Sequence, residues 1–159
     1  MFRNNAVAAA VVAAGAIPQL VKLLSSGSDD GRVYAAVELG NLACGNDTIT
    51  AAVVAAGAIP LLVELLSSGS GAGRVFAAAT LVSLTAGNSD NTAAAVAAGA
   101  IHPLVKLLSD GSDKGSAYAM VTLGNLACSN DTNTAAVVAA GAIPLLVELL
   151  RATAQTRAR

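Results

Sequence analysis

Residues 51–66 read AAVVAAGAIPLLVELL, and this stretch decides the fold because it recurs along the chain. The tetrapeptide Gly-Ala-Ile-Pro, or its variant Gly-Ala-Ile-His, begins at Gly15, Gly57, Gly99 and Gly141, which are spaced by 42 residues. A period of this length is typical of proteins built from stacked helical repeats. The spacing predicts one domain over residues 1–159, divided into units 4–45, 46–87 and 88–129 and a partial unit 130–159.

Each full unit contains three stretches that favour helices. In the second unit, the first stretch runs over 47–56, with Asp47 or Thr48 as its N-terminal cap. The second begins near Pro60, because proline suits a first helical turn. The third covers about 74–85 and carries Ala and Leu at helical spacing, which indicates a buried stripe.

Composition narrows the possible classes of protein. The chain has 159 residues, of which 55% are hydrophobic, 3% aromatic and 12% charged, with a net charge of −1. These values favour helices packed on small side chains over a disordered chain. Nucleic-acid binding requires clustered Lys and Arg, so we expect no nucleic-acid partner. Gly and Pro interrupt the apolar runs before they reach the ~20 residues of a membrane helix, so we expect no membrane span.

Two features bear on the cellular compartment. Residues 1–16 imitate a secretory signal, but their apolar run recurs at 51–58 and 135–142, which favours a structural role. Cys44 and Cys128 lie in Ala-rich helical context, and we expect them to be reduced and buried. These observations predict an intracellular, reducing compartment, either cytoplasmic or nuclear.

The repeated unit resembles the armadillo repeat. The resemblance rests on AAGAIPLLVELL at 55–66, on the three helices per unit, and on RVYAAVELGNLAC at 32–44. It covers essentially the whole chain. It implies an all-α, right-handed superhelical solenoid whose third helices line a concave groove. It also implies a non-catalytic protein-interaction scaffold.

The resemblance further suggests which residues face that groove. In peptide-binding armadillo proteins of the importin-alpha type, an Asn holds the peptide backbone and a Trp four residues earlier forms an apolar slot. Here Asn41 and Asn125 match the Asn, but the Trp and an acidic position that favours basic cargo are replaced. We therefore expect an extended peptide or helix partner rather than nuclear-import cargo. The candidate groove residues are Asn41, Ser83, Asn125, Tyr34, Phe76, Tyr118, Val37, Ala79, Val121 and Glu38.

A structural interpretation stands beside this functional one. The aromatic side chains would fill gaps that Ala leaves between neighbouring helices, and the Asn amides would bond to an adjacent unit. Lys22, Glu64, Lys106 and Glu148 alternate in sign at one repeat position of the second helix, and adjacent units could pair them.

No catalytic or cofactor-binding pattern emerges from the sequence. The Gly-rich loop 69–73 follows a helix rather than a strand and lacks the phosphate-binding Lys. His102 has no second His or Cys nearby in the sequence, so a metal site is not expected. We expect no enzyme, no cofactor and no metal.

The partial fourth unit suggests a second possible role. It lacks a third helix, which would leave apolar surface that another copy of the chain, or a longer array, could cover. Segments 40–66 and 124–150 are almost identical, as a duplicated block or a designed or ancestral-type consensus would be. The alternative function is a structural or self-assembling repeat module without a dedicated ligand. The candidate self-association residues are Leu145, Leu146, Leu149 and Leu150.

Overall fold

A computed structural model describes residues 2–110 and 112–157, which form eleven α-helices without any β-strand in these ranges. The helices recur in threes with the 42-residue period. In chain order they are α1 (Phe2–Ala13), α2 (Ala16–Ser26), α3 (Asp29–Ala43), α4 (Asp47–Ala55), α5 (Ala58–Ser68), α6 (Gly71–Thr85), α7 (Ser89–Ala97), α8 (Ile101–Asp110), α9 (Asp113–Ala127), α10 (Asp131–Ala139) and α11 (Ala142–Arg157).

Asparagine, rather than the expected aspartate or threonine, caps the short first helices. The side chain of Asn46 accepts a hydrogen bond from the backbone N–H of Ile49, and Asn88 and Asn130 do the same in the next units. The prediction of Asp47 or Thr48 was therefore wrong by one or two residues. Asn46 has an extended backbone, which lets its carboxamide reach back over the first helical turn.

Glycine produces the sharp bend between the first and second helices. Gly57 has a φ of +86°, a left-handed conformation that L side chains adopt only with strain. The axes of α4 and α5 consequently differ by 76°, and α7 and α8 by 83°. The third helices begin earlier than the sequence suggested, because Ser70 accepts from the N–H of Gly73 and α6 starts at Gly71 rather than near Arg74.

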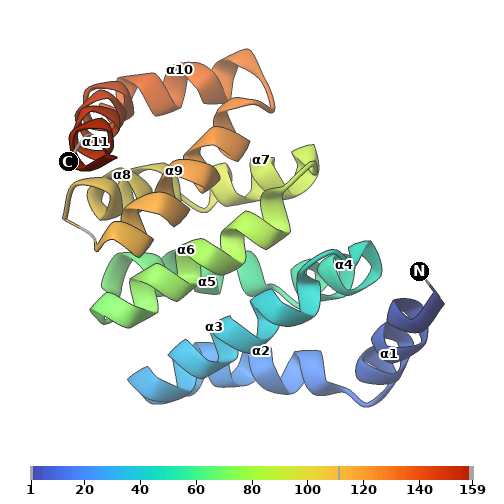
Figure 1. Cartoon of the computed structure of the whole chain (residues 1–159). Helices are drawn as coiled ribbons and strands as arrows, with labels where there is room; N and C mark the ends of the chain where they lie inside the picture. Colours follow the sequence, from blue (N-terminus) through green and yellow to red (C-terminus); the bar gives the residue numbers. More distant parts are fainter. Residues whose placement is uncertain (1, 111, 158–159) are drawn as a thin grey trace.

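The third helices α3, α6 and α9 pack side by side across the front of the molecule (Figure 1). The second helices α2, α5 and α8 lie behind them, and each packs against the third helix of its own unit. Leu39, Leu81 and Leu123 occupy the same repeat position and are almost fully buried, so the core also repeats every 42 residues.

Helix α11 runs to Arg157 and is longer than the other second helices. Leu145, Leu146 and Leu149 are half-buried against the core, whereas Leu150 is 61% exposed. Within the described ranges no single helix is long and apolar enough to span a membrane. Three bent pairs, α4 with α5, α7 with α8, and α10 with α11, meet the length and composition requirement together.

Candidate functional site

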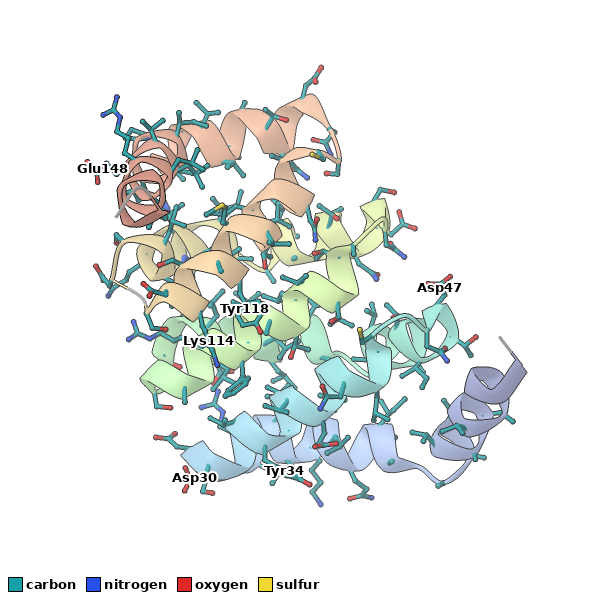
Figure 2. The ribbon with its side chains drawn as sticks, viewed as in Figure 1. Asp30, Tyr34, Asp47, Lys114, Tyr118 and Glu148 are labelled. Carbon is teal, nitrogen blue, oxygen red and sulfur yellow. The ribbon has the colours of Figure 1, made fainter. Side chains whose placement is uncertain are left out.

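The outward side of α3, α6 and α9, which we call the third-helix face, carries the predicted groove residues. Tyr34 is 61% exposed, and Phe76 and Tyr118, at the same repeat position, are 38% and 37% exposed. Figure 2 shows Tyr34 on α3 and Tyr118 on α9, both in the N-terminal halves of their helices. The remaining predicted residues on this face are exposed or half-buried: Val37, Glu38, Asn41, Ala79, Ser83, Val121 and Asn125.

The difference among the aromatic residues follows from their neighbours. Phe76 lies one turn before Thr80 on the same side of α6, and that side meets α3. Tyr34 holds the equivalent place on α3, and no third helix precedes α3 in the part of the chain that the structure describes. Phe76 and Tyr118 are thus less exposed than Tyr34, although all three side chains reach the surface.

Polar groups at the Asn position differ from unit to unit. Asn41 is exposed on α3. Asn125 is half-buried, and its Nδ2 donates to Thr85 Oγ1 of the preceding third helix at 3.2 Å. Asn125 therefore already contacts an adjacent unit, while its carbonyl oxygen can still accept a hydrogen bond. Sequence reasoning missed Thr85, because the other units carry Ala at this position.

The Thr residues equivalent to Glu38 do not face the solvent. Thr80 and Thr122 are 1% and 0% exposed. Thr80 Oγ1 donates to Ala36 O of α3 at 2.7 Å, and Thr122 Oγ1 donates to Ala78 O of α6 at 3.2 Å. Their position therefore joins neighbouring third helices. Glu38 is half-exposed because its side of α3 points away from α6.

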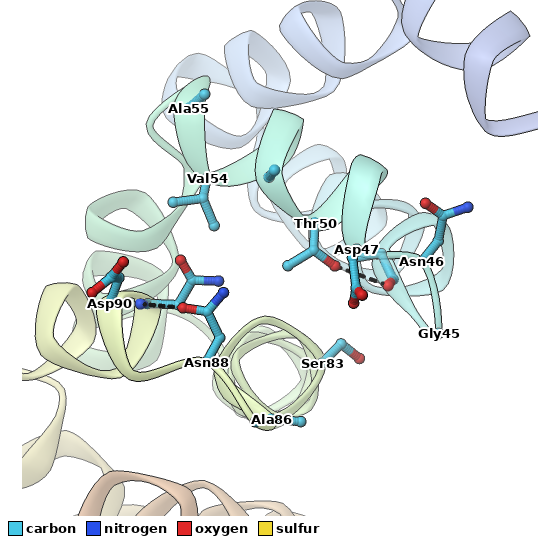
Figure 3. A pocket seen from close by; sticks show the side chains of 14 residues that line it. Gly45, Asn46, Asp47, Thr50, Val54, Ala55, Ser83, Ala86, Asn88 and Asp90 are labelled. Carbon is cyan, nitrogen blue, oxygen red and sulfur yellow. Dashed lines mark hydrogen bonds between the residues drawn. The ribbon is translucent and has the colours of Figure 1, made fainter. Parts of the chain in front are cut away.

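A polar pocket of about 630 Å³ opens where the end of α6 meets the starts of α4 and α7, and we call it the first junction pocket. Figure 3 shows the side chains of Thr50, Ser83 and Asn88 around this space. Hydroxyl and carboxamide groups can bond to a peptide backbone, and two carboxylates add negative charge. The polar side chains that line it are Asn46, Asp47, Thr50, Ser83, Asn88, Asp90 and Asn91.

The next unit repeats this pocket. The second junction pocket, of about 310 Å³, includes residues at the register positions of the first, and Asn125 stands where Ser83 stands in the first. Ser89 replaces Asp47, so the second pocket has fewer carboxylates. The polar side chains that line it are Thr85, Asn88, Ser89, Thr92, Asn125, Cys128 and Ser129. Ser83 and Asn125, which share the repeat position of Asn41 on the third-helix face, therefore also line the first and second junction pockets.

Two expectations about other side chains were wrong. Cys44 and Cys128 are both exposed rather than buried, because α3 and α9 end at Ala43 and Ala127 and the cysteines follow as cap residues. Glu64 pairs with Arg32, Nη2 to Oε1 at 3.2 Å, rather than with the lysines of the second helices. This is the one ion pair among the described residues.

No metal site is evident in the described ranges. No cluster of three or more His, Cys, Asp or Glu side chains in these ranges could hold a metal ion. His102 is exposed at the start of α8. The site is therefore a surface of amides, hydroxyls and aromatic rings, which suits reversible binding of a polypeptide.

Comparison with known proteins agrees with this geometry. The armadillo/beta-catenin-like repeat family matches residues 4–44 and 88–128. No curated protein has significant sequence similarity to the chain. A designed armadillo repeat protein in complex with the peptide (KR)4 superimposes with a TM-score of 0.83, at 33% identity, over 91% of this chain and 60% of that one.

Two further solved structures give similar values. Computationally designed armadillo repeat proteins for modular peptide recognition match with a TM-score of 0.82 and 34% identity, over 90% of this chain and 60% of that one. Another designed armadillo repeat protein matches with a TM-score of 0.81 and 34% identity, over 87% of this chain and 58% of that one. The chain thus spans little more than half the length of the designed proteins it matches.

Proposed function

The chain belongs to the armadillo/beta-catenin-like repeat family, and from that premise we propose that it is a non-catalytic scaffold that binds a peptide or helix. The binding surface is the third-helix face together with the two junction pockets. An extended peptide has an unpaired N–H and C=O at every residue, and a surface with repeated amide groups can bond to them. The observation that carries the proposal is the alignment of Asn41, Ser83 and Asn125 along this face.

The chemistry of the face indicates the kind of peptide. A structural neighbour is in complex with the basic peptide (KR)4. In this chain Tyr34, Phe76 and Tyr118 take the place where the resemblance expects acidic groups. Glu38 is the one acid among the predicted groove residues, and Asp47 and Asp90 lie apart from the aromatic residues, in the first junction pocket. We propose that the part of the peptide on the third-helix face is uncharged or mildly apolar and contacts the exposed ring of Tyr34.

A peptide library provides the test. A random-sequence peptide library displayed on phage is selected on the immobilised protein, and enriched peptides are measured by fluorescence anisotropy. Changing Asn41→Ala and Asn125→Ala together should weaken binding about tenfold or more, because each Ala removes a backbone hydrogen bond of about 1 kcal/mol. Far-UV circular dichroism should stay unchanged.

The matched control is Gln19→Ala, which removes an exposed amide from α2, outside the third-helix face. This variant should bind like the unmodified protein. Equal affinities for the double variant and the control would refute the site. Strong enrichment of Lys- and Arg-rich peptides would refute the proposed preference.

Self-association is the second candidate function, and one observation favours it. Apolar side chains on α10 and α11 reach the surface, and Leu150 is 61% exposed. Burial of such a surface stabilises association by about 25 cal/mol per Å². We propose that a second copy of the chain covers it. The exposed apolar residues on these two helices are Val138, Ile143, Val147 and Leu150.

Light scattering over a concentration series tests this second candidate. A mass that rises with concentration, and returns to that of one chain in Leu150→Glu, would support it. A constant mass of one chain would remove it, and the third-helix face would remain the surface to examine for partners.

A further inference from the structure

A pocket of about 270 Å³ lies among α5, α6 and α8, outside the third-helix face and both junction pockets. We call it the basic pocket, because three of its six lining side chains are basic. Helix α8 packs against both α5 and α6 here. The lining residues are Leu66, Ser67, Arg74, His102, Pro103 and Lys106.

In the first unit, the arginine at the equivalent position has hydrogen-bond partners. Arg32 holds the repeat position of Arg74, and its Nε donates to the backbone oxygen of Leu24 at 3.1 Å. Its Nη2 donates to Glu64 Oε1 on the next unit's second helix at 3.2 Å. The guanidinium is thus anchored by a carbonyl and neutralised by a carboxylate.

In the third unit, a neutral side chain donates a hydrogen bond to the equivalent backbone carbonyl. Ser116 replaces the arginine there, and its Oγ donates to the backbone oxygen of Leu108 at 3.2 Å. Leu108 stands at the same repeat position as Leu24. The two outer units therefore agree in their use of this position, and the second unit departs from both.

In the second unit the expected partners are missing. Arg74 Nε is buried and has no hydrogen-bond partner among the described residues. Lys106 stands at the repeat position of Glu64, the partner of Arg32, and His102 stands at the repeat position of Pro60. Arg74 and Lys106 form no ion pair within the described ranges. Lys106 thus places a positive charge at the repeat position where the first unit's arginine meets a carboxylate.

No acid forms an ion pair with Arg74 or Lys106 in the described ranges. The three helices around the pocket carry two carboxylates, Glu64 and Asp110. Glu64 is bound to Arg32, and Asp110 Oδ1 accepts a hydrogen bond from Ser109 Oγ. The guanidinium of Arg74 is half-buried and the ammonium of Lys106 is exposed, so an anion in the pocket would meet two cations that have no carboxylate partner.

We propose that the basic pocket is a binding site for a small phosphate-class oxyanion. A doubly charged anion balances the charges of both Arg74 and Lys106, whereas a carboxylate would leave one uncompensated. The planar guanidinium suits bidentate contact with phosphate oxygens. Leu66 and Pro103 add apolar walls that leave room for a small organic group on the phosphate.

His102 reports directly on this pocket, because it is the one histidine in the sequence. Proton NMR signals of its imidazole are followed while inorganic phosphate is added at constant ionic strength, with chloride as the balancing anion. Saturable shifts are expected in the millimolar range, and acetate should give weaker binding. Phenyl phosphate distinguishes the source of the anion: tighter binding than inorganic phosphate assigns an organic phosphate, and equal binding assigns free phosphate.

Charge variants distinguish a specific binding site from general electrostatic attraction to the protein. Lys106→Glu places a carboxylate near Arg74, as Glu64 lies near Arg32 of the first unit. This carboxylate should occupy the site and weaken phosphate binding about tenfold or more. Lys22→Glu makes the same charge change at the same repeat position of α2, away from the pocket, and should bind like the unmodified protein. Arg74→Gln is the second variant and should also lose binding.

The outcomes are distinct. Saturable binding that Lys106→Glu and Arg74→Gln abolish and Lys22→Glu preserves supports the site. The absence of saturation in the unmodified protein would overturn it. Equal weakening by Lys106→Glu and Lys22→Glu would also overturn it, since net charge alone would then explain the shifts. Acetate that binds as tightly as phosphate would overturn the assignment to a doubly charged anion.

Discussion

The two threonines that join the third helices allow a sharp comparison, because their hydrogen bonds differ in length. Thr80 Oγ1 lies 2.7 Å from Ala36 O, whereas Thr122 Oγ1 lies 3.2 Å from Ala78 O. Each hydroxyl also lies within hydrogen-bond distance of a carbonyl one turn earlier in its own helix. Substitution by valine replaces the hydroxyl with a methyl group of similar size, so the two variants test the same change at two spacings.

We expect Thr80→Val to destabilise the protein more than Thr122→Val. Loss of the hydrogen bond costs about 1 kcal/mol at either position. A carbon–oxygen contact needs about 3.3–3.6 Å, so a methyl group fits against the neighbouring helix almost without strain at position 122 but is about 0.6 Å too close to Ala36 O at position 80. Overpacking of that kind adds about 1–2 kcal/mol. Gly40 permits this close approach of the two helices, because a Cβ at that position would lie only 2.8 Å from Thr80 Oγ1. The contact with the carbonyl one turn earlier in the same helix is short at both positions, 2.9 Å at Thr80 and 2.8 Å at Thr122, so its cost is shared by the two variants.

Urea denaturation followed by far-UV circular dichroism measures the free energy of unfolding of each variant. The loss for Thr80→Val is expected to exceed that for Thr122→Val by about 1–2 kcal/mol, the cost of overpacking against the neighbouring helix. Thr80→Ser keeps the hydroxyl and should lose less than about 1 kcal/mol, the value of one buried methyl group. A Thr122→Val loss as large as that of Thr80→Val would refute the reasoning from spacing.

Three further predictions concern the core, the bends and the thiols. Leu81→Ala should lower the free energy of unfolding in urea by about 3 kcal/mol, because Leu81 is fully buried, and a loss below about 1 kcal/mol would mean that the core collapses around it. Gly57→Ala should lower the melting temperature through about 1 kcal/mol of strain at a φ of +86°, whereas Gly71→Ala, which meets no atom within 4 Å, should not lower it. Cys44 and Cys128 are exposed, so both should react with a thiol reagent in the native protein as readily as in urea, and protection of either would contradict the described surface.

The helices were predictable because their start and stop signals repeat. Gly57 and its equivalents end each first helix in a left-handed turn, and a spacing of 42 residues can be read without structural knowledge. The capping residue was not predictable to the same precision. Asn46, Asp47 and Thr48 are all good caps, and only the extended backbone at Asn46 selects among them.

The surfaces of the third helices were harder to predict. Helical periodicity distinguishes the inner side of a helix from its outer side. In a stack, each third helix also has an additional surface that contacts the third helix of the neighbouring unit. Thr80 and Thr122 lie on that surface and are buried, although they share the repeat position of Glu38, which is half-exposed. Cys44 was misjudged for a related reason: α3 ends one residue before it, so the buried stripe no longer applies.

The basic pocket was partly visible in the sequence. His102 and Lys106 interrupt the repeat pattern, and both departures could be noted by alignment of the units. Their meeting with Arg74 could not, since it requires α8 to pack across the start of α6 and the end of α5. The junction pockets also depend on packing, because their walls come from helices of neighbouring units.

The contacts between third helices differ from one seam to the next. The seam between α3 and α6 is held by one short hydrogen bond of 2.7 Å and the close approach at Gly40. The seam between α6 and α9 is held by two longer hydrogen bonds, Thr122 Oγ1 to Ala78 O and Asn125 Nδ2 to Thr85 Oγ1, both 3.2 Å. A peptide that lies across Ser83 and Asn125 would span the α6–α9 seam, and its binding would therefore add a further link between these two helices.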